Sequence, residues 1–366
     1  MTSATTEVLT TKLSHRLLTQ CQHKHLPLRS TIPYCAAVST CFVLCLYIFV
    51  PSTVRRLPRD DVRHIKWRLF AVFVFTTMSI CVYPFIFCFD EEKVTGDDGG
   101  GNRFPALHIM GWSPFHPARD LLILLHVCCL YLGPFVASFL KIHVARKNVV
   151  MYDGFVTTTK RGSIPPAVGY IQATREVALL PLSNRLSNIQ SDPALFWGII
   201  RDLIVAPFAE EIVFRGMIVP ALLSSHLSPT TTSWVSPLFF GTAHLHHAYL
   251  RLQSKLESTR IVWLTTLVQF SYTSLFGAYV SHAFLRTGSL VGVTLGHSFC
   301  NYWGLPNLGF LSKTDRSELS CVYGFRWIIS VMYVIGMIIF GIGFRSGNWS
   351  FFPEESVLPS LLLMSE

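Results

Sequence analysis

Residues 69–88 read LFAVFVFTTMSICVYPFIFC, a stretch of twenty residues without a charged side chain. A helix needs about 20 consecutive apolar residues to cross the hydrocarbon core of a bilayer, so this stretch predicts a transmembrane helix. Comparable apolar runs lie at 33–50, 120–140, 195–223, 234–249, 260–286, 288–304 and 325–344. The sequence therefore predicts an all-α polytopic membrane protein with about eight transmembrane helices.

The composition of the whole chain supports this fold class. Of the 366 residues, 51% are hydrophobic and 14% are charged, whereas charged residues make up about 25% of an ordinary soluble domain. The net charge is +9, which would suit a nucleic-acid partner if the basic residues lined one surface. They lie instead in short loops between apolar runs, so we expect contact with membrane lipids and no nucleic-acid partner.

The distribution of polar residues divides the chain into a membrane domain and two tails. We expect residues 1–32 to be a disordered N-terminal tail, 33–345 a single helical membrane domain with its catalytic core at 194–306, and 346–366 a short C-terminal tail. Because the loops on one side carry about twice as many lysines and arginines as those on the other, the positive-inside bias places the N-terminus and the loop 96–102 outside the cytosol.

The ten cysteines form no metal-binding pattern. Most of them lie within apolar runs, among them Cys41, Cys88 and Cys300, and no CxxC pair or Cys/His metal spacing occurs. We therefore expect them to act mainly as small buried hydrophobic residues.

Two adjacent glutamates interrupt the fourth apolar run, in PFAEEIVFRG at 207–216. Ionisable residues inside a membrane helix are costly and usually mark a functional site. Glu211 and Arg215 are four residues apart, which predicts an ion pair on one helix face with a structural role. Glu210 points about 100° away and has no local counter-ion, which suits a general base. The alternative is that Glu210 hydrogen-bonds a neighbouring helix.

Three histidines follow in FFGTAHLHH at 239–247. His244 and His247 are three residues apart and are predicted to share a helix face, while His246 points elsewhere. Sets of histidine and glutamate can bind zinc, but the HExxH pattern is absent from the chain, so we expect no metal. The alternative is that these histidines are satisfied core residues.

The seventh run contains GHSFCNYWGLP at 296–306. His297 and Asn301 are one helical turn apart, and an amide beside an imidazole can stabilise a developing oxyanion. An interhelical hydrogen bond is the structural alternative, and a nucleophilic Cys300 paired with His297 is the rival chemistry. Because GxSxG and GxGD patterns are absent, water activated by a glutamate is the favoured mechanism.

Together, these stretches resemble the type II CAAX prenyl endopeptidases, also called Ras-converting enzymes, within the glutamic intramembrane proteases that carry the EExxxR signature. The resemblance covers 201–306 and rests on RDLIVAPFAEEIVFRGMIVPAL, SPLFFGTAHLHH, FGAYVSHAFLRTGSLVG and GHSFCNYWGLP, in the family's order. LYLGPF at 130–135 is similar to a further segment of the family.

The resemblance implies a multi-pass enzyme of the endoplasmic-reticulum membrane, whose active site lies in a bundle-interior cavity facing the cytosol. It would remove the last three residues from proteins whose CaaX cysteine is farnesylated or geranylgeranylated, such as Ras-like small GTPases, without a cofactor. The family's pattern assigns water activation to Glu210 and His244 and oxyanion stabilisation to His297 and Asn301. The residues implied to support them are Glu211, Arg215 and His247.

Three other functions remain open at this point. The chain could be an EExxxR protease with a different membrane substrate. It could also be a non-catalytic membrane scaffold, or a transporter whose buried glutamate and histidines relay protons.

Overall fold

The computed structural model describes residues 13–14, 25–88, 105–112, 117–151, 191–313 and 319–344, with side chains described except at 145–151. Within these ranges the secondary-structure elements are all helices, as the sequence predicted. Most of the predicted N-terminal tail, the loop 96–102 and the C-terminal tail lie outside the described residues. The chain divides into two compact units, one formed by 1–120, 205–294 and 353–366, and the other by 121–204 and 295–352.

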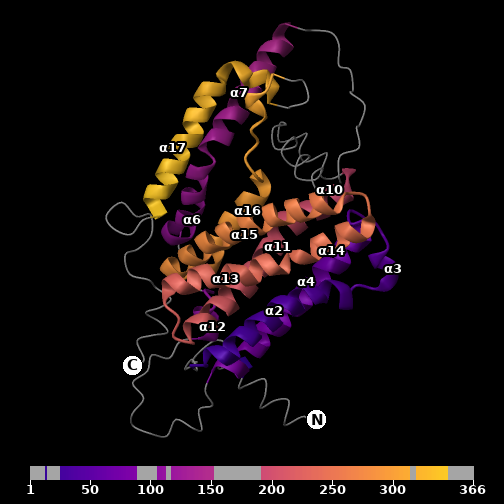
Figure 1. The fold of residues 1–366 in the computed structure, drawn as a ribbon, viewed down its shortest axis with the longest axis vertical. Coiled ribbons are helices and arrows are strands. Elements are labelled where there is room, and N and C mark those ends of the chain that lie inside the picture. The colour runs from indigo at the N-terminus through magenta and orange to yellow at the C-terminus, as the bar shows by residue number, and fades with distance from the viewer. Residues whose placement is uncertain are drawn as a thin grey trace. The chain divides into compact units, whose positions relative to one another are not determined.

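The first unit is built mainly from the helices α2, α4, α13 and α15 and the short elements that carry the glutamates. Its elements are α2 (Leu28–Ile48), α3 (Ser52–Arg55), α4 (Val62–Phe87), α5 (Ala106–Ile109), α11 (Ala206–Glu211), η3 (Ile212–Ile218), α12 (Val219–Leu223), α13 (Pro229–Ala243), α14 (Leu245–Ser254) and α15 (Thr259–Thr287). Figure 1 shows α13 running beside α15, and α2 beside α4. Helix α2 begins at Leu28, so the N-terminal tail is shorter than predicted.

Side-chain caps fix where these helices begin. Asp61 accepts a hydrogen bond from the backbone N–H of Arg63 at the start of α4. Ser228 and Ser258 cap α13 and α15 in the same way. Such caps satisfy backbone donors that a helix leaves without an internal partner. Helix α15 ends at Thr287 and is capped by Gly288, whose φ of 60° is the left-handed conformation that glycine adopts readily.

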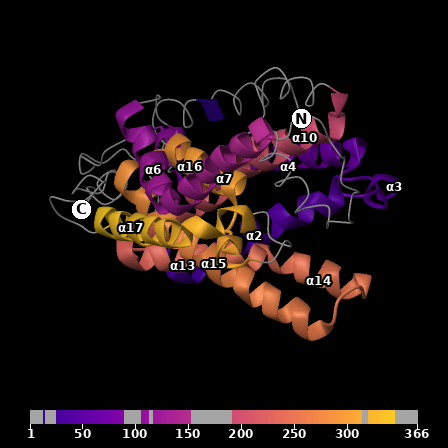
Figure 2. The ribbon, with the colours of Figure 1, turned by 90° about the horizontal axis from the view of Figure 1, so that it is seen from above.

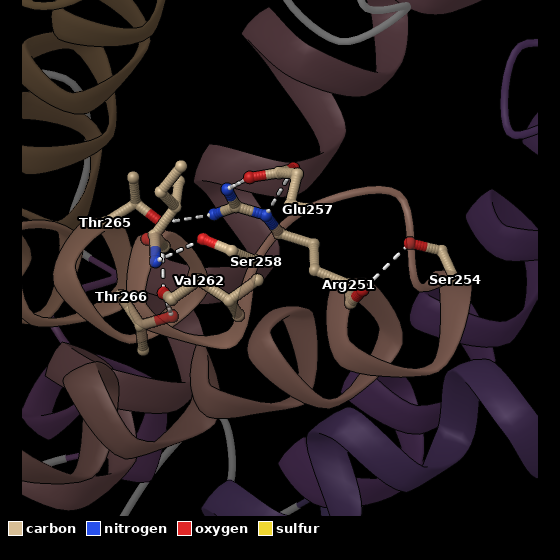
Figure 3. Close-up of polar contacts among 8 residues, drawn as sticks. Arg251, Ser254, Glu257, Ser258, Val262, Thr265 and Thr266 are labelled. Atoms are coloured by element: carbon tan, nitrogen blue, oxygen red, sulfur yellow. Dashed lines mark hydrogen bonds and ion pairs between the residues drawn. The ribbon is translucent and has the colours of Figure 1, made fainter.

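Helices α14 and α15 are joined by a short turn (Figure 2). The side chain of Arg251 closes this turn (Figure 3). Arg251 donates to both carboxylate oxygens of Glu257, and its Nη1 donates to the hydroxyl of Thr265 at 2.6 Å. Lys255 ends α14 with a φ of 53°, in the left-handed region. This cluster joins the end of the histidine-bearing helix α14 to the first turns of α15.

The second unit contains most of α16. Its described elements are α6 (Pro117–Leu130) beyond its first turn, α7 (Leu132–Met151), α10 (Pro193–Ile200), η2 (Arg201–Val205), α16 (Leu290–Trp303) beyond its first turn, η4 (Gly309–Leu311), η5 (Ser320–Phe325) and α17 (Arg326–Phe344). Helices α7 and α17 run side by side (Figure 1). A buried cluster of Ala137, Phe310, Val322 and Ile329 holds this pair and the 3-10 turns together.

Fewer helices than predicted are long and apolar enough to cross a membrane. Among the described residues α2, α4, α15 and the stretch Ser320–Phe344 qualify, and α6 with α7 adds a fifth span if this pair, bent by 68°, counts as one. Helices α13 and α16 have 15 and 14 residues, which gives about 21–23 Å against a hydrocarbon core of about 30 Å. The predicted count of eight spans therefore remains a prediction.

Large apolar side chains are exposed along the helices that qualify as spans. Phe73 on α4 is 66% exposed, Leu264 on α15 is 63% exposed and Trp327 on α17 is 72% exposed. Soluble proteins rarely expose contiguous apolar surfaces of this kind, whereas lipid-facing helices do. The predicted class of helical membrane protein is therefore supported by the structure.

The cysteines only partly follow the prediction of small buried residues. Cys35 and Cys45 on α2 are buried, but Cys41 on the same helix is exposed. Cys88 at the end of α4 is disulfide-bonded, which the sequence spacing did not indicate.

Candidate active site

The glutamates lie on a helical segment that alternates between α and π geometry. The sequence predicted one helix over 195–223, but the π-helical elements η2 and η3 flank α11 on either side. Pro207 lies in the first turn of α11, directly after η2, and Pro220 lies in the first turn of α12, directly after η3. A proline lacks an N–H and clashes with the carbonyl four residues earlier, and we attribute the wider π turns to these prolines. Such π segments are frequent at functional sites.

Glu211 and Arg215 form a fully buried ion pair. Nη1 of Arg215 donates to Oε1 of Glu211 at 3.2 Å, and Nε lies 3.1 Å from Oε2. The second contact is electrostatic rather than a well-aligned hydrogen bond. The side chains of Glu211 and Arg215 are 0% and 1% exposed. The ion pair predicted from the four-residue spacing is therefore present.

The guanidinium of Arg215 also binds two neighbouring helices of the first unit. Its Nη2 donates to the backbone carbonyl of Gly277 on α15 at 3.5 Å, and its central carbon lies 5.0 Å from the ring centroid of Phe240 on α13. A Cβ at position 277 would lie 2.8 Å from Cβ of Pro237, a distance that side chains do not tolerate. Gly277 thus allows α13 and α15 to approach closely around the ion pair.

Glu210 differs from its neighbour in burial and in electrostatic environment. Its side chain is half-buried on α11, whereas Glu211 is fully buried. The charge of Glu210 also acts on Arg215, although more weakly than the charge of Glu211 does. Glu210 therefore has Arg215 within electrostatic range, contrary to the expectation that it has no local counter-ion.

His244 lies at the break between α13 and α14. Its Nδ1 lies 2.8 Å from the backbone carbonyl oxygen of Phe240. A carbonyl oxygen only accepts hydrogen bonds, so Nδ1 carries the proton and donates. The neutral imidazole then carries its lone pair on Nε2, the atom that can accept a proton. The ring packs edge-on against Phe240, with centroids 4.7 Å apart.

The three histidines lie close together at the start of α14. The predicted helix over 234–249 is interrupted at His244, but His247 still donates its backbone N–H to the carbonyl of His244 at 3.0 Å, so the three-residue spacing is kept. The ring centroids of His246 and His247 are 3.9 Å apart, closer than the 6.1 Å between His244 and His247. The expectation that His246 points away from the others was therefore wrong. No group of three His, Cys, Asp or Glu side chains in the described residues has an arrangement that could hold a metal ion.

His297 and Asn301 lie one turn apart on the continuous α-helix α16, as predicted. His297 is 5% exposed, and Asn301 is half-buried. Nδ2 of Asn301 donates to the backbone carbonyl of Asp202 at 3.0 Å. The α16 helix therefore presents an oriented amide donor one turn beyond a buried imidazole.

The carbonyl that orients Asn301 belongs to Asp202, a π-helical residue that was not among the predicted site residues. In π geometry the carbonyl of residue 202 would accept from the N–H of residue 207, but residue 207 is a proline and has no N–H. Arg201 holds the Asp202 side chain through Nε at 2.6 Å and Nη2 at 2.9 Å. The quoted motif RDLIVAP contained both residues, yet their pairing with Asn301 could not be read from it.

Aromatic residues fix the second half of α16 within its unit. Tyr131, at the bend between α6 and α7, donates its hydroxyl to the backbone carbonyl of Gly304 at 3.0 Å. Its ring packs edge-on against Phe299, and Phe135 packs against Trp303. Tyr131 and Phe135 belong to the stretch LYLGPF, so this stretch supports the helix that carries Asn301.

The structure thus groups the predicted residues in two sets. The first unit contains Glu210, Glu211, Arg215, His244 and His247, and the second unit contains His297 and Asn301. The first set offers a half-buried carboxylate and an imidazole of fixed tautomer. The second set offers a buried imidazole and an oriented amide.

Comparison with known proteins identifies the region that holds both sets. Residues 192–303 match the family model described as "Type II CAAX prenyl endopeptidase Rce1-like". "CAAX prenyl protease 2" of Homo sapiens is 31% identical over 74% of this chain and 70% of its own length. "Probable CAAX prenyl protease 2" of Schizosaccharomyces pombe is 34% identical over 82% of this chain and 87% of its own.

A shorter match has a higher sequence identity. "CAAX prenyl protease 2" of Arabidopsis thaliana is 44% identical over 30% of this chain and 35% of its own length. No solved structure matches the chain. The extent of the human and fission-yeast matches, together with the family model, shows that this chain belongs to the Rce1-like type II CAAX prenyl endopeptidase family.

Proposed function

We propose that the protein is a membrane endopeptidase that removes the C-terminal tripeptide from farnesylated or geranylgeranylated CaaX proteins, such as Ras-like small GTPases. The observation that carries this proposal is the similarity, over most of the chain, to relatives named CAAX prenyl proteases. The family match at 192–303 includes every polar side chain assigned to the site. The apolar, exposed helices α2, α4, α15 and α17 support a site that a lipid-anchored substrate reaches from the bilayer.

We assign water activation to Glu210 and His244. A half-buried carboxylate on a π-flanked helix can take a proton from water while remaining reachable by substrate. The Phe240 carbonyl holds His244 in the tautomer whose Nε2 accepts a proton. Glu211 and Arg215 support this site by holding the local backbone in place, and His247 packs beside His246 in the same cluster. The mechanism proposed is therefore of the glutamic type, with no metal.

We assign oxyanion stabilisation to His297 and Asn301. When hydroxide attacks the scissile carbonyl carbon, negative charge develops on the carbonyl oxygen and requires donors already in position. One N–H of the Asn301 amide is engaged by the Asp202 carbonyl, and an amide nitrogen carries a second N–H. This bond orients the amide before the substrate arrives, which avoids reorganisation during the reaction.

We further propose a multi-pass protein of the endoplasmic-reticulum membrane with eight spans and an active site that faces the cytosol. The excess of basic residues in alternate loops supports this orientation. The disulfide at Cys88 supports it too, because disulfides persist in oxidising compartments such as the lumen of the endoplasmic reticulum. The charge bias predicts that the end of α4 at Cys88 is lumenal.

The test is release of the tripeptide from a farnesylated CaaX peptide by the purified full-length protein in detergent. We expect wild-type protein to release it, and Glu210→Gln and His244→Ala to lose about a hundredfold or more of the rate. Absence of cleavage by folded wild-type protein would refute the proposed function. Wild-type rates in folded Glu210→Gln would refute the assignment of the base while leaving the function intact.

A further inference from the structure

The segment between α2 and α4, together with the first turns of α4, concentrates cations that the proposed reaction does not use. Residues 52–68 contain six basic side chains and two acidic ones, so their net charge is positive. The basic residues are Arg55, Arg56, Arg59, Arg63, Lys66 and Arg68. Five of them are exposed, and Arg68 is half-buried. Figure 1 shows the helix α3 of this segment at one end of the paired helices α2 and α4.

Hydrogen bonds hold the backbone of this segment in a defined shape. His64 is buried in the first turn of α4. Its Nδ1 donates to the carbonyls of Leu57 and Pro58, at 3.1 Å and 3.2 Å. The backbone N–H of Asp61 donates to the carbonyl of Pro58 at 3.0 Å. The turn that carries the cations is therefore fixed against α4.

Exposed apolar residues show where the lipid-facing surface begins on both helices. Ile48, the last residue of α2, is 70% exposed, and Trp67 in the second turn of α4 is 38% exposed. Tryptophan is enriched at the level of the lipid headgroups in membrane proteins. Most of the cationic segment lies between these two residues along the chain, which places it at the level of the headgroups.

On α4 a cation continues the lipid-facing side of the helix. Positions 63, 67 and 70 share one helix face, because they are four and then three residues apart. Phe70 is 53% exposed, and its ring packs edge-on against Trp67 with centroids 5.7 Å apart. The side chain of Arg63 is 71% exposed and lies 3.3 Å from Asp61, and an exposed ion pair of this kind contributes little to stability. The guanidinium of Arg63 thus lies one turn beyond an exposed aromatic pair.

The cationic segment also adjoins the histidine cluster of the candidate site. The ring of Tyr47 on α2 packs edge-on against His246, with centroids 6.3 Å apart. The charges of Arg59 and Arg68 act on His246 and His247. The cations are therefore at the same end of the first unit as these histidines.

We propose that residues 52–68 form a binding surface for the anionic headgroups of membrane phospholipids. Arginine and lysine bind phosphate and carboxylate groups through charge-assisted hydrogen bonds. Clusters of about four to eight such residues beside a transmembrane helix attract the anionic lipids of the cytoplasmic leaflet. The charge bias assigns this segment to the cytosolic face, so the surface and these lipids are on the same side. The inference does not depend on the proposed protease activity and is tested without a peptide substrate.

The experiment follows the unfolding temperature of the purified full-length protein in detergent micelles as phosphatidylserine is added. Phosphatidylcholine with the same acyl chains, whose headgroup has no net charge, is the control lipid. A ligand that binds the native state raises the unfolding temperature, and the rise gives an apparent Kd. We expect phosphatidylserine to raise the temperature several degrees more than phosphatidylcholine. This difference should largely disappear in about 1 M salt, where the Debye length is about 3 Å.

Substitutions show whether the effect belongs to this surface. A cation near an anionic membrane surface contributes about 1 kcal/mol, or about fivefold in affinity, so we expect Arg56→Gln to weaken phosphatidylserine binding about fivefold. Combining it with Arg55→Gln and Arg63→Gln should weaken binding about 100-fold. Arg29→Gln is the matched control, because Arg29 is exposed at the other end of α2, about 30 Å away along the helix axis. We expect this control to keep the wild-type affinity.

Three results would overturn the inference. The first is an equal temperature shift with both lipids, and the second is a triple variant that keeps the wild-type affinity. The third is a loss in Arg29→Gln as large as in Arg56→Gln, since the effect would then follow net charge rather than this surface. The temperature of each variant in phosphatidylcholine is its own baseline, so a less stable variant still gives an affinity.

Soluble phosphoserine separates a membrane-bound headgroup from a free anion. It carries the same charged groups without the acyl chains, and we expect it to leave the unfolding temperature unchanged at the concentrations at which the lipid acts. A shift as large as that of phosphatidylserine would assign the cations to a free anion and overturn the proposed lipid surface.

Discussion

The buried pair of Glu211 and Arg215 should dominate the stability of the first unit. Both side chains are excluded from solvent, with contacts at 3.1 Å and 3.2 Å. Replacing Glu211 by leucine leaves Arg215 buried without its main counter-ion, and such a loss costs about 3–5 kcal/mol. The bond from Arg215 to Gly277, the Phe240 ring and the weaker attraction of the Glu210 carboxylate remain.

This magnitude converts to a thermal shift that is easily measured. In large domains about 1 kcal/mol corresponds to about 2 °C, so Glu211→Leu should lower the unfolding temperature by about 6–10 °C. The assay is tryptophan fluorescence during heating of the purified protein in detergent. Glu210→Gln is the matched control at the neighbouring position, and because Glu210 is only half-buried, we expect a much smaller shift together with loss of turnover.

A double variant separates the ion pair from local packing. A buried ion pair can often be replaced by apolar residues of similar volume with little loss, whereas breaking it from one side is costly. Glu211→Leu combined with Arg215→Met should therefore melt at a higher temperature than either single variant. Single variants within about 2 °C of wild type, or a double variant as unstable as the sum of the two, would refute this account of the pair.

Three other expectations follow from the geometry. Gly277→Ala should lower the unfolding temperature by several degrees, because its Cβ would lie 2.8 Å from Pro237, and a variant as stable as wild type would show that α13 and α15 separate readily. Asn301→Ala should reduce tripeptide release about 100-fold with little change in KM, as loss of one oxyanion donor does; a loss confined to KM would instead indicate a role in substrate binding. Cys300→Ala should keep its turnover, and strong chelators should not inhibit the wild-type enzyme, whereas zinc-restorable inhibition would indicate a metal mechanism.

Local spacing predicted the interactions that span one helical turn. Glu211 and Arg215 pair as expected, and His297 and Asn301 share a continuous helix. These outcomes depend on positions four residues apart, where the backbone alone determines which side chains meet. The fold class followed from hydropathy for a similar reason, because the length of an apolar run is itself the relevant quantity.

Departures from regular helix geometry could not be predicted in this way. The predicted helix over 234–249 is broken at His244, and π turns flank the short helix that carries the two glutamates. The bond between Asn301 and Asp202 joins residues 99 positions apart. Spacing along one helix carries no information about such contacts, since they depend on which helices pack together.

The positions of the polar residues explain why fewer helices than predicted are long and apolar enough to cross a membrane. The candidate site residues lie on α11, η3, α14 and α16 and at the break before α14, and these elements are short or bounded by breaks. The elements α2, α4, α15 and α17 are long and expose apolar side chains. Unsatisfied backbone and ionised side chains are costly in lipid, so irregular helices that carry charge require protein around them. Hydropathy along the sequence does not distinguish these two kinds of helix. The long helices therefore have the length and the apolar surface that crossing a bilayer requires. The short helices do not have to satisfy this requirement, so their geometry can depart from a regular α-helix at the site residues.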